Sequence, residues 1–353
     1  MKLNIMQTVV LAGVVLAGAA IAVTTLERPP VQVTQNGYRG VGMQQLSNPR
    51  LAEAMAARNQ APQSIVSVPD VGPKAGQLYK NVQVLGDLGV AQFARTMAAI
   101  TAWVSPEQGC NYCHNPNNMA SDEVYTKVVA RRMFQMTAAL NTQWQDHVQQ
   151  TGVTCYTCHR GQPVPAYNWS EDTKPPRLAG LSAGQAGQNM PRASVGSTSL
   201  PYDPFTPFLE DRPANIRVQG TAIHPNPKVP GTKETEWTYG LMMHMSTSLG
   251  VNCTFCHNSR NWSSWEESTP QRMTAWYGIR MVRDINANYI TPLTPQWQAH
   301  PNGPEGGPVQ ARLGHEGDAL KVNCTTCHQG VNKPLYGAAM AKDYPALLIP
   351  QSR

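Results

Sequence analysis

The sequence is poor in charged residues, which make up 14% of its 353 residues, and its formal net charge of +6 is not gathered into any Lys/Arg-rich run. Nucleic-acid binding needs such a basic patch, so its absence favours a solvated, mildly basic surface instead. The chain also has no cysteine outside four C-x-x-C pairs, and therefore none near the N-terminus to carry a lipid. What it has in abundance is 29 prolines and 28 glycines, which indicate extensive irregular backbone.

Each of the four C-x-x-C pairs is followed directly by a histidine. A disulfide framework has no reason to place histidine after every second cysteine. C-x-x-C-H is instead the attachment sequence of c-type heme, in which the thiols become thioethers to the porphyrin and the histidine binds the iron. Four copies leave zinc binding or thioredoxin-like chemistry as minor alternatives. We predict four covalently attached c-type hemes on Cys110, Cys113, Cys155, Cys158, Cys253, Cys256, Cys324 and Cys327, with proximal iron ligands His114, His159, His257 and His328.

The N-terminal region contains a nearly uninterrupted apolar run from Ile5 to Val23. As a helix this run spans roughly 28 Å, which is enough to cross the hydrocarbon core of a bilayer. The small residues Ala19, Ala20 and Ala22 also resemble a signal-peptide cleavage site, and either alternative exports the rest of the chain. We expect residues 1–26 to be an uncleaved anchor, with Lys2 on the cytoplasmic side.

The rest of the chain repeats itself. After a Pro/Gln/Gly-rich tether over residues 27–76, residues 77–161 contain a helix, a first motif, a second helix and a second motif, and residues 232–335 repeat this order. A Pro-rich connector over 162–231 separates the two segments, and 336–353 form a tail. Internal duplication is the simplest explanation. The expected fold is mainly α with extensive irregular loops, made of two pseudo-repeated heme-pair modules plus an N-terminal transmembrane helix.

The second axial ligand of each iron decides between electron transfer and chemistry, because a sixth protein ligand leaves no open position for a substrate. Met97 lies on a helix that ends shortly before the first motif, and Met242 holds the matching place before the third, with Met245 on the same face. Met133 and Met136 lie one turn apart between the first and second motifs, and either is placed to reach the second heme.

The fourth heme lacks a matching methionine. Aligning "MTAALN" (136–141) with "MVRDIN" (281–286) sets Gly278 opposite Met133. The residues alone leave three ligands possible for this iron: His147, His300 and His315.

The arrangement resembles the tetraheme cytochrome subunit of photosynthetic reaction centres of purple bacteria, over nearly all of residues 77–335. The resemblance rests on the paired motifs, the Pro-rich connector, the methionine helices, and the stretches "GVTCYTCHRGQ" and "VNCTTCHQG". It implies Met97, Met133 and Met242 as distal ligands of the first three hemes, and His147 as the distal ligand of the fourth. Some members are anchored by a lipid on an N-terminal cysteine, which the apolar run would replace here.

The resemblance implies an electron carrier rather than an enzyme, on the periplasmic face of the bacterial inner photosynthetic membrane. Electrons would come from a soluble donor, either cytochrome c2-like or a high-potential iron-sulfur protein, and pass to the bacteriochlorophyll special pair held by the L and M subunits. The third-motif heme would lie nearest the pigment and the first-motif heme farthest. Since Met/His ligation raises the potential relative to His/His, the fourth heme should lie below the second and third. The alternatives are a free or quinol-side multiheme cytochrome, and a multiheme reductase with a vacant iron position.

Overall fold

The computed structural model describes residues 4–25, 30–37, 42–172, 187–211, 213–218, 231–307 and 309–349. Within these ranges the predicted mainly α fold with an apolar N-terminal helix is confirmed, and the sheet is a single two-stranded hairpin. The longer helices are α1 (Ile5–Thr25), α2 (Pro49–Arg58), α4 (Val90–Val104), α5 (Tyr125–Gln143), α8 (Thr232–Leu249) and α9 (Pro270–Asp284). The shorter elements are β1 (Gln32–Gln35), β2 (Gln44–Ser47), α3 (Ala75–Leu78), α6 (Gln145–Val148), α7 (Cys155–His159), α10 (Thr294–Ala299) and α11 (Cys324–His328).

The helix ends follow local sequence signals. α4 ends where Pro106 cannot continue a helix, and its cap is Ser105. α8 ends at Gly250, whose φ of 63° is the left-handed conformation that glycine adopts without a steric penalty. α9 begins at Pro270 after the N-cap Thr269, because proline fits the first helical turn.

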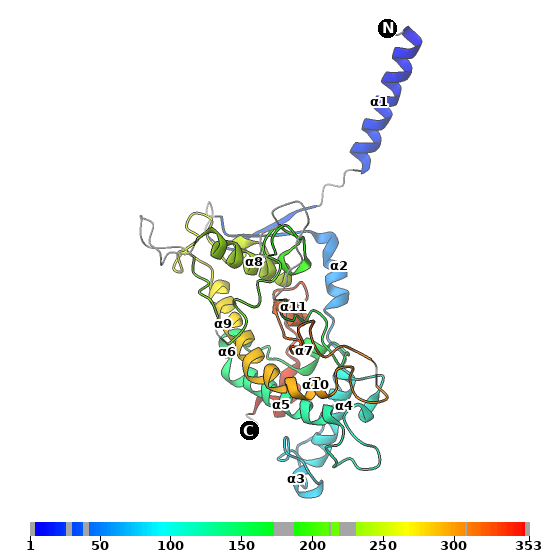
Figure 1. The fold of residues 1–353 in the computed structure, drawn as a ribbon, viewed down its shortest axis with the longest axis vertical. Helices are drawn as coiled ribbons and strands as arrows, with labels where there is room; N and C mark the ends of the chain where they lie inside the picture. Colours follow the sequence, from blue (N-terminus) through cyan, green and yellow to red (C-terminus); the bar gives the residue numbers. More distant parts are fainter. Residues whose placement is uncertain are drawn as a thin grey trace.

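α1 is long and apolar enough to cross a membrane, and it is the one helix of the described residues with these properties. It projects away from the rest of the protein, beyond the end that carries α8, whereas α3 lies at the opposite end (Figure 1). The described residues on α1 are all exposed, so the helix makes no apolar contacts that would hold it to the other elements.

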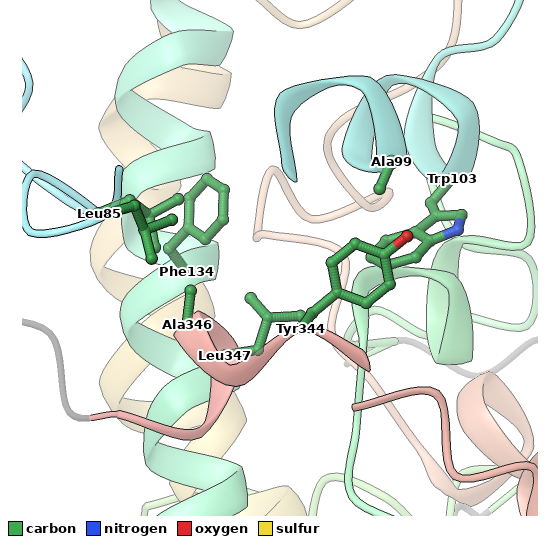
Figure 2. Close-up of a cluster of buried hydrophobic side chains, with 8 residues drawn as sticks. Leu85, Ala99, Trp103, Phe134, Tyr344, Ala346 and Leu347 are labelled. Atoms are coloured by element: carbon green, nitrogen blue, oxygen red, sulfur yellow. The ribbon is translucent and has the colours of Figure 1, made fainter. Parts of the chain in front are cut away.

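The buried side chains form separate clusters rather than one core. Figure 2 shows the first cluster, in which residues of α4 and α5 meet the C-terminal segment. Trp103 contacts Tyr344 edge to face, with the ring centres 4.7 Å apart. The two other clusters lie around Leu241 of α8 and around Ile285 after α9. Each of the three clusters includes at least one of the methionines singled out from the sequence.

The β1–β2 hairpin packs on the segment that begins the third motif. The strands pair antiparallel, and Asn252, directly before Cys253, donates from Nδ2 to the carbonyl of Gln44 at 2.9 Å. In return the backbone N–H of Leu46 donates to Asn252 Oδ1 at 2.9 Å. The stretch expected to be a tether therefore holds the loop of the third motif through its described residues.

Candidate heme-binding sites

The histidines of the first and third motifs are oriented in the same way. His114 Nδ1 lies 3.1 Å from the carbonyl oxygen of Met119, and His257 Nδ1 lies 3.1 Å from that of Trp262. A carbonyl oxygen can only accept, so Nδ1 carries the hydrogen and Nε2 keeps its lone pair. Metal-binding histidines are fixed in this way by a backbone carbonyl on the other ring nitrogen. Both imidazoles are thus in the tautomer that binds iron through Nε2.

The histidines of the second and fourth motifs form a second matching pair. His159 Nδ1 contacts the carbonyl of Gln162 at 2.9 Å, and His328 Nδ1 contacts that of Val331 at 3.0 Å. Burial lowers the pKa of His159, and it lowers that of His328 to about 4. Both rings are therefore neutral near pH 7, which is the state in which imidazole ligates a metal.

The second and fourth motifs are short helices, capped by the residues that precede them. In α7 the backbone N–H of Thr154 donates to Thr157 Oγ1 at 3.0 Å, and in α11 that of Asn323 donates to Thr326 Oγ1 at 3.0 Å. The first and third motifs instead begin as 3-10 turns, Gly109–Tyr112 and Cys253–Phe255. The four motifs thus fall into two structural kinds that alternate along the chain.

Two buried asparagines fix the helices to the residue two places before each helical motif. Asn141 of α5 donates from Nδ2 to the carbonyl of Val153 at 2.9 Å and accepts from the Val153 N–H at 2.7 Å. Asn286, just after α9, makes the same pair of bonds with Val322, at 3.0 and 2.9 Å. The alignment that sets Gly278 opposite Met133 also sets Asn286 opposite Asn141, so the sequence register and these contacts agree.

A cavity of about 720 Å³ lies between the first two motifs. This volume is within the range of roughly 300–1,000 Å³ that cofactor pockets occupy. Met97, Met133 and Met136 line it together with His114 and His159. The structure therefore brings the methionines predicted near the first two motifs to the same apolar space as the histidines of those motifs, and both Met133 and Met136 line it.

Arg312 also lines this cavity, and nothing in its sequence context points to it. Its side chain is buried and donates to the Tyr112 hydroxyl at 2.9 Å, while its Nε has no hydrogen-bond partner among the described residues. Burial raises the pKa of Tyr112 to about 12, so the phenol is neutral and leaves the guanidinium charge uncompensated. A buried cation of this kind requires an anionic partner. Heme carboxylates have the required chemistry, so the residues of this cavity fit the predicted cofactor.

Met242 and Met245 of α8 pack against the cluster around Leu241. The adjacent His244 is oriented differently from the motif histidines. Its Nδ1 contacts the Ser194 carbonyl at 3.0 Å and its Nε2 lies 3.2 Å from Ser248 Oγ, so both ring nitrogens are engaged. Both ring nitrogens of His244 are therefore used within the protein, and Met242 and Met245 remain the candidate ligands on this helix.

Among the three histidines considered for the fourth heme, the structure brings His147 to the fourth motif. Its ring centre lies 6.0 Å from that of His328, with the planes inclined by 69°. Two imidazoles on opposite sides of one metal, with metal–nitrogen bonds of about 2.0 Å, have centres roughly 6 Å apart. His300 is exposed and stacks on Tyr125 with the ring centres 4.2 Å apart, and His315 is exposed as well.

The orientation of His147 again leaves Nε2 free. Its Nδ1 lies 2.9 Å from the carbonyl of Thr274 on α9, and burial lowers its pKa. A neutral ring with hydrogen on Nδ1 has its lone pair on Nε2. His147 thus has the same tautomer as the four motif histidines, although it belongs to no motif.

The cysteines of the second and fourth motifs lie against each other. Cys158 and Cys327 form a disulfide, with their Cα atoms 4.6 Å apart, whereas the other six cysteines are free thiols. Burial raises the pKa of Cys155 and of Cys324 to about 12, which keeps these thiols protonated rather than as metal-binding thiolates. A sulfur in a disulfide cannot also be a thioether, so heme attachment at both Cys158 and Cys327 requires these two sulfurs to be separate.

Comparison with known proteins gives a consistent result. The family model described as photosynthetic reaction centre cytochrome C subunit matches residues 27–348. The photosynthetic reaction center cytochrome c subunit of Thermochromatium tepidum is 51% identical over 98% of this chain and 80% of its own length. That of Rubrivivax gelatinosus is 50% identical over 98% of this chain and 89% of its own length. That of Roseobacter denitrificans is 38% identical over 95% of this chain and 90% of its own length.

Proposed function

Because this chain belongs to the photosynthetic reaction centre cytochrome c subunit family, it functions in photosynthetic electron transfer, and we propose that it does so through four c-type hemes whose irons it ligates on both faces. The hemes supply one-electron chemistry, and the chain supplies attachment, ligands, spacing and local charge. We propose Met97, Met133, Met242 and His147 as the distal ligands, opposite His114, His159, His257 and His328.

The observation that carries the proposal is the pairing of His147 with His328. An enzyme needs an iron with an open face, and the fourth heme is the one for which the duplicated helix offers no methionine. The His147 ring, which comes from the other proposed module, has its centre 6.0 Å from that of His328, and this separation supports His147 as the missing ligand. A histidine placed there supports a relay with no vacant position for a substrate.

Contacts between the motifs support the order first, second, fourth, third along the molecule. The first and second motifs share the cavity, and the N–H of Gly161 donates to the Trp103 carbonyl at 2.8 Å. Arg160, directly after the second motif, donates to the carbonyl of Cys327 in the fourth at 3.2 Å. The N–H of Gly330, just after the fourth motif, donates to the carbonyl of Ser248 on α8, which leads into the third. We propose two duplicated heme-pair modules joined where the second and fourth motifs meet.

The N-terminal segment supports an orientation with the third motif toward the membrane. Thr25 ends α1 and Gln32 begins β1, and a chain of this length spans at most roughly 25 Å. The hairpin is in turn bound to Asn252 before the third motif. We propose that α1 anchors the protein to the inner photosynthetic membrane with the hemes on the periplasmic side. Electrons would then leave toward the special pair held by the L and M subunits from the third-motif heme.

We propose a soluble donor at the opposite end, where the first motif lies, of either the cytochrome c2 or the high-potential iron-sulfur class. A flash experiment on membranes tests the function directly. After a saturating flash, we expect the α-band of c-type heme to bleach as the oxidised special pair recovers. Pigment oxidation that recovers with no change in the heme spectrum would show that the partner is wrong.

A further inference from the structure

Gly278 on α9 lies directly against the imidazole of His147. A β-carbon at this position would lie 2.6 Å from Cε1, 2.8 Å from Nδ1 and 3.2 Å from Nε2 of His147. Two of these distances are shorter than any contact that a real β-carbon makes. Gly278 is buried within a regular helix, so its lack of a side chain serves space rather than an unusual backbone conformation.

Thr274, one helical turn earlier, provides the hydrogen bond that fixes the same ring. Its carbonyl oxygen accepts from His147 Nδ1 at 2.9 Å. Residues four apart lie on the same face of a helix, so this face of α9 provides an acceptor at one position and room for the ring at the next. Thr274 and Gly278 together fix the His147 imidazole with its Nε2 free and its ring centre 6.0 Å from that of His328.

The duplicated helix α5 differs at the equivalent position, where it carries a long side chain instead of glycine. In the register that aligns Asn141 with Asn286, Gly278 corresponds to Met133, and the Met133 side chain lines the cavity of the first module. One module therefore places its own side chain toward its heme site. The other has no side chain there and admits one from its neighbour.

We propose that Gly278 is the positioning residue that allows His147 to occupy the sixth coordination position of the fourth heme iron. The inference rests on the proposed function, because it requires a heme at the fourth motif. Gly278 does not touch the iron; it determines which side chain can reach it. A side chain at this position displaces the His147 ring from α9 and breaks the bond to Thr274.

The Gly278→Ala substitution in the full heme-loaded protein tests this inference. We expect one of the four hemes to lose its low-spin bis-histidine signature in electron paramagnetic resonance, and to bind carbon monoxide when reduced. Gly240→Ala is the matched control, because Gly240 is also helical but a β-carbon there meets nothing closer than 3.3 Å. It should leave all four hemes unchanged. Wild-type spectra and potentials in Gly278→Ala would overturn the inference.

Two further variants separate this inference from the proposed function. If His147→Ala leaves every heme unchanged, the ligand assignment fails and the role of Gly278 falls with it. If His147→Ala alters one heme and Gly278→Ala alters none, only the role of Gly278 is refuted. The double variant Gly278→Met, His147→Ala recreates the arrangement of the first module, so we expect a six-coordinate fourth heme with a raised potential. A fourth heme that stays open in this variant also contradicts the inference.

Discussion

Replacing Asn141 or Asn286 by leucine should loosen one module at a time. Asn141 bonds Val153 twice and also donates to the Leu347 carbonyl at 2.8 Å. Asn286 bonds Val322 twice and donates to the Leu209 carbonyl at 3.0 Å. Each substitution removes three hydrogen bonds. Asn141→Leu leaves two carbonyls and one N–H without these partners, whereas Asn286→Leu leaves one carbonyl and one N–H, because the Val322 carbonyl still accepts from Trp169 Nε1 at 2.9 Å.

The size of the effect follows from these unpaired groups. Each costs about 1–3 kcal/mol, so the low end of this range gives a loss of about 3 kcal/mol for Asn141→Leu and about 2 kcal/mol for Asn286→Leu. For a chain of this size such a loss lowers the melting temperature by on the order of 5 °C. Asn288→Leu is the matched control, because Asn288 is exposed and its side chain bonds only that of Asp284 among the described residues. Its effect should stay within about 0.5 kcal/mol.

Thermal unfolding of the heme-loaded protein and a redox titration of each variant provide the readouts. Asn141 holds the residue two places before Cys155, and Asn286 holds the one two places before Cys324. We therefore expect Asn141→Leu to shift mainly the second heme and Asn286→Leu mainly the fourth. Equal melting temperatures for all three variants, or the same heme shifted by both buried substitutions, would refute the equivalence of the two modules.

Three other changes have defined outcomes. Lys321→Met removes a buried ammonium 2.6 Å from Asp318, which should cost about 3–5 kcal/mol in denaturant unfolding. Burial lowers the pKa of Lys321, but its carboxylate partners outweigh burial and raise this pKa above 10.5. The stability that Lys321 contributes should therefore be complete below pH 10.5 and be lost as the pH rises through the pKa of Lys321 in the folded protein. An unfolding free energy that does not change over this pH range would contradict the prediction. Arg312→Met should lower the potential of the first or second heme in a redox titration, because a buried cation disfavours ferric iron, whereas exposed Arg280→Met should not. Replacing residues 1–26 by a cleavable secretory signal, in cells that lack the L and M subunits, should release the hemoprotein from the membrane fraction with its spectrum intact, and retention in membranes there would exclude α1 as the anchor.

The features that local sequence determines were predictable. C-x-x-C-H specifies its own chemistry, and the ends of α4, α8 and α9 follow from Pro106, Gly250 and Pro270. The mismatch of Gly278 with Met133 also indicated that the fourth site differs from the second. It could not show that a histidine ring fills the space, because this contact joins positions 127 to 131 residues apart in the chain.

The features that escaped prediction depend on contacts between distant segments. Arg312 lies in a loop with no periodic pattern, and its partner Tyr112 is 200 residues away in sequence. The hairpin contact of Gln44 with Asn252 spans 208 residues. Short polar stretches of this kind have many possible partners, and only the packed chain selects one of them.

The most direct test of the account is a structure of the heme-loaded protein in its membrane complex, read at the fourth iron. The account predicts that this iron lies between Nε2 of His147 and Nε2 of His328, with the His147 ring against Gly278. A fourth iron that has an open face, or that is bound by His300 or His315 while His147 points into solvent, would contradict it.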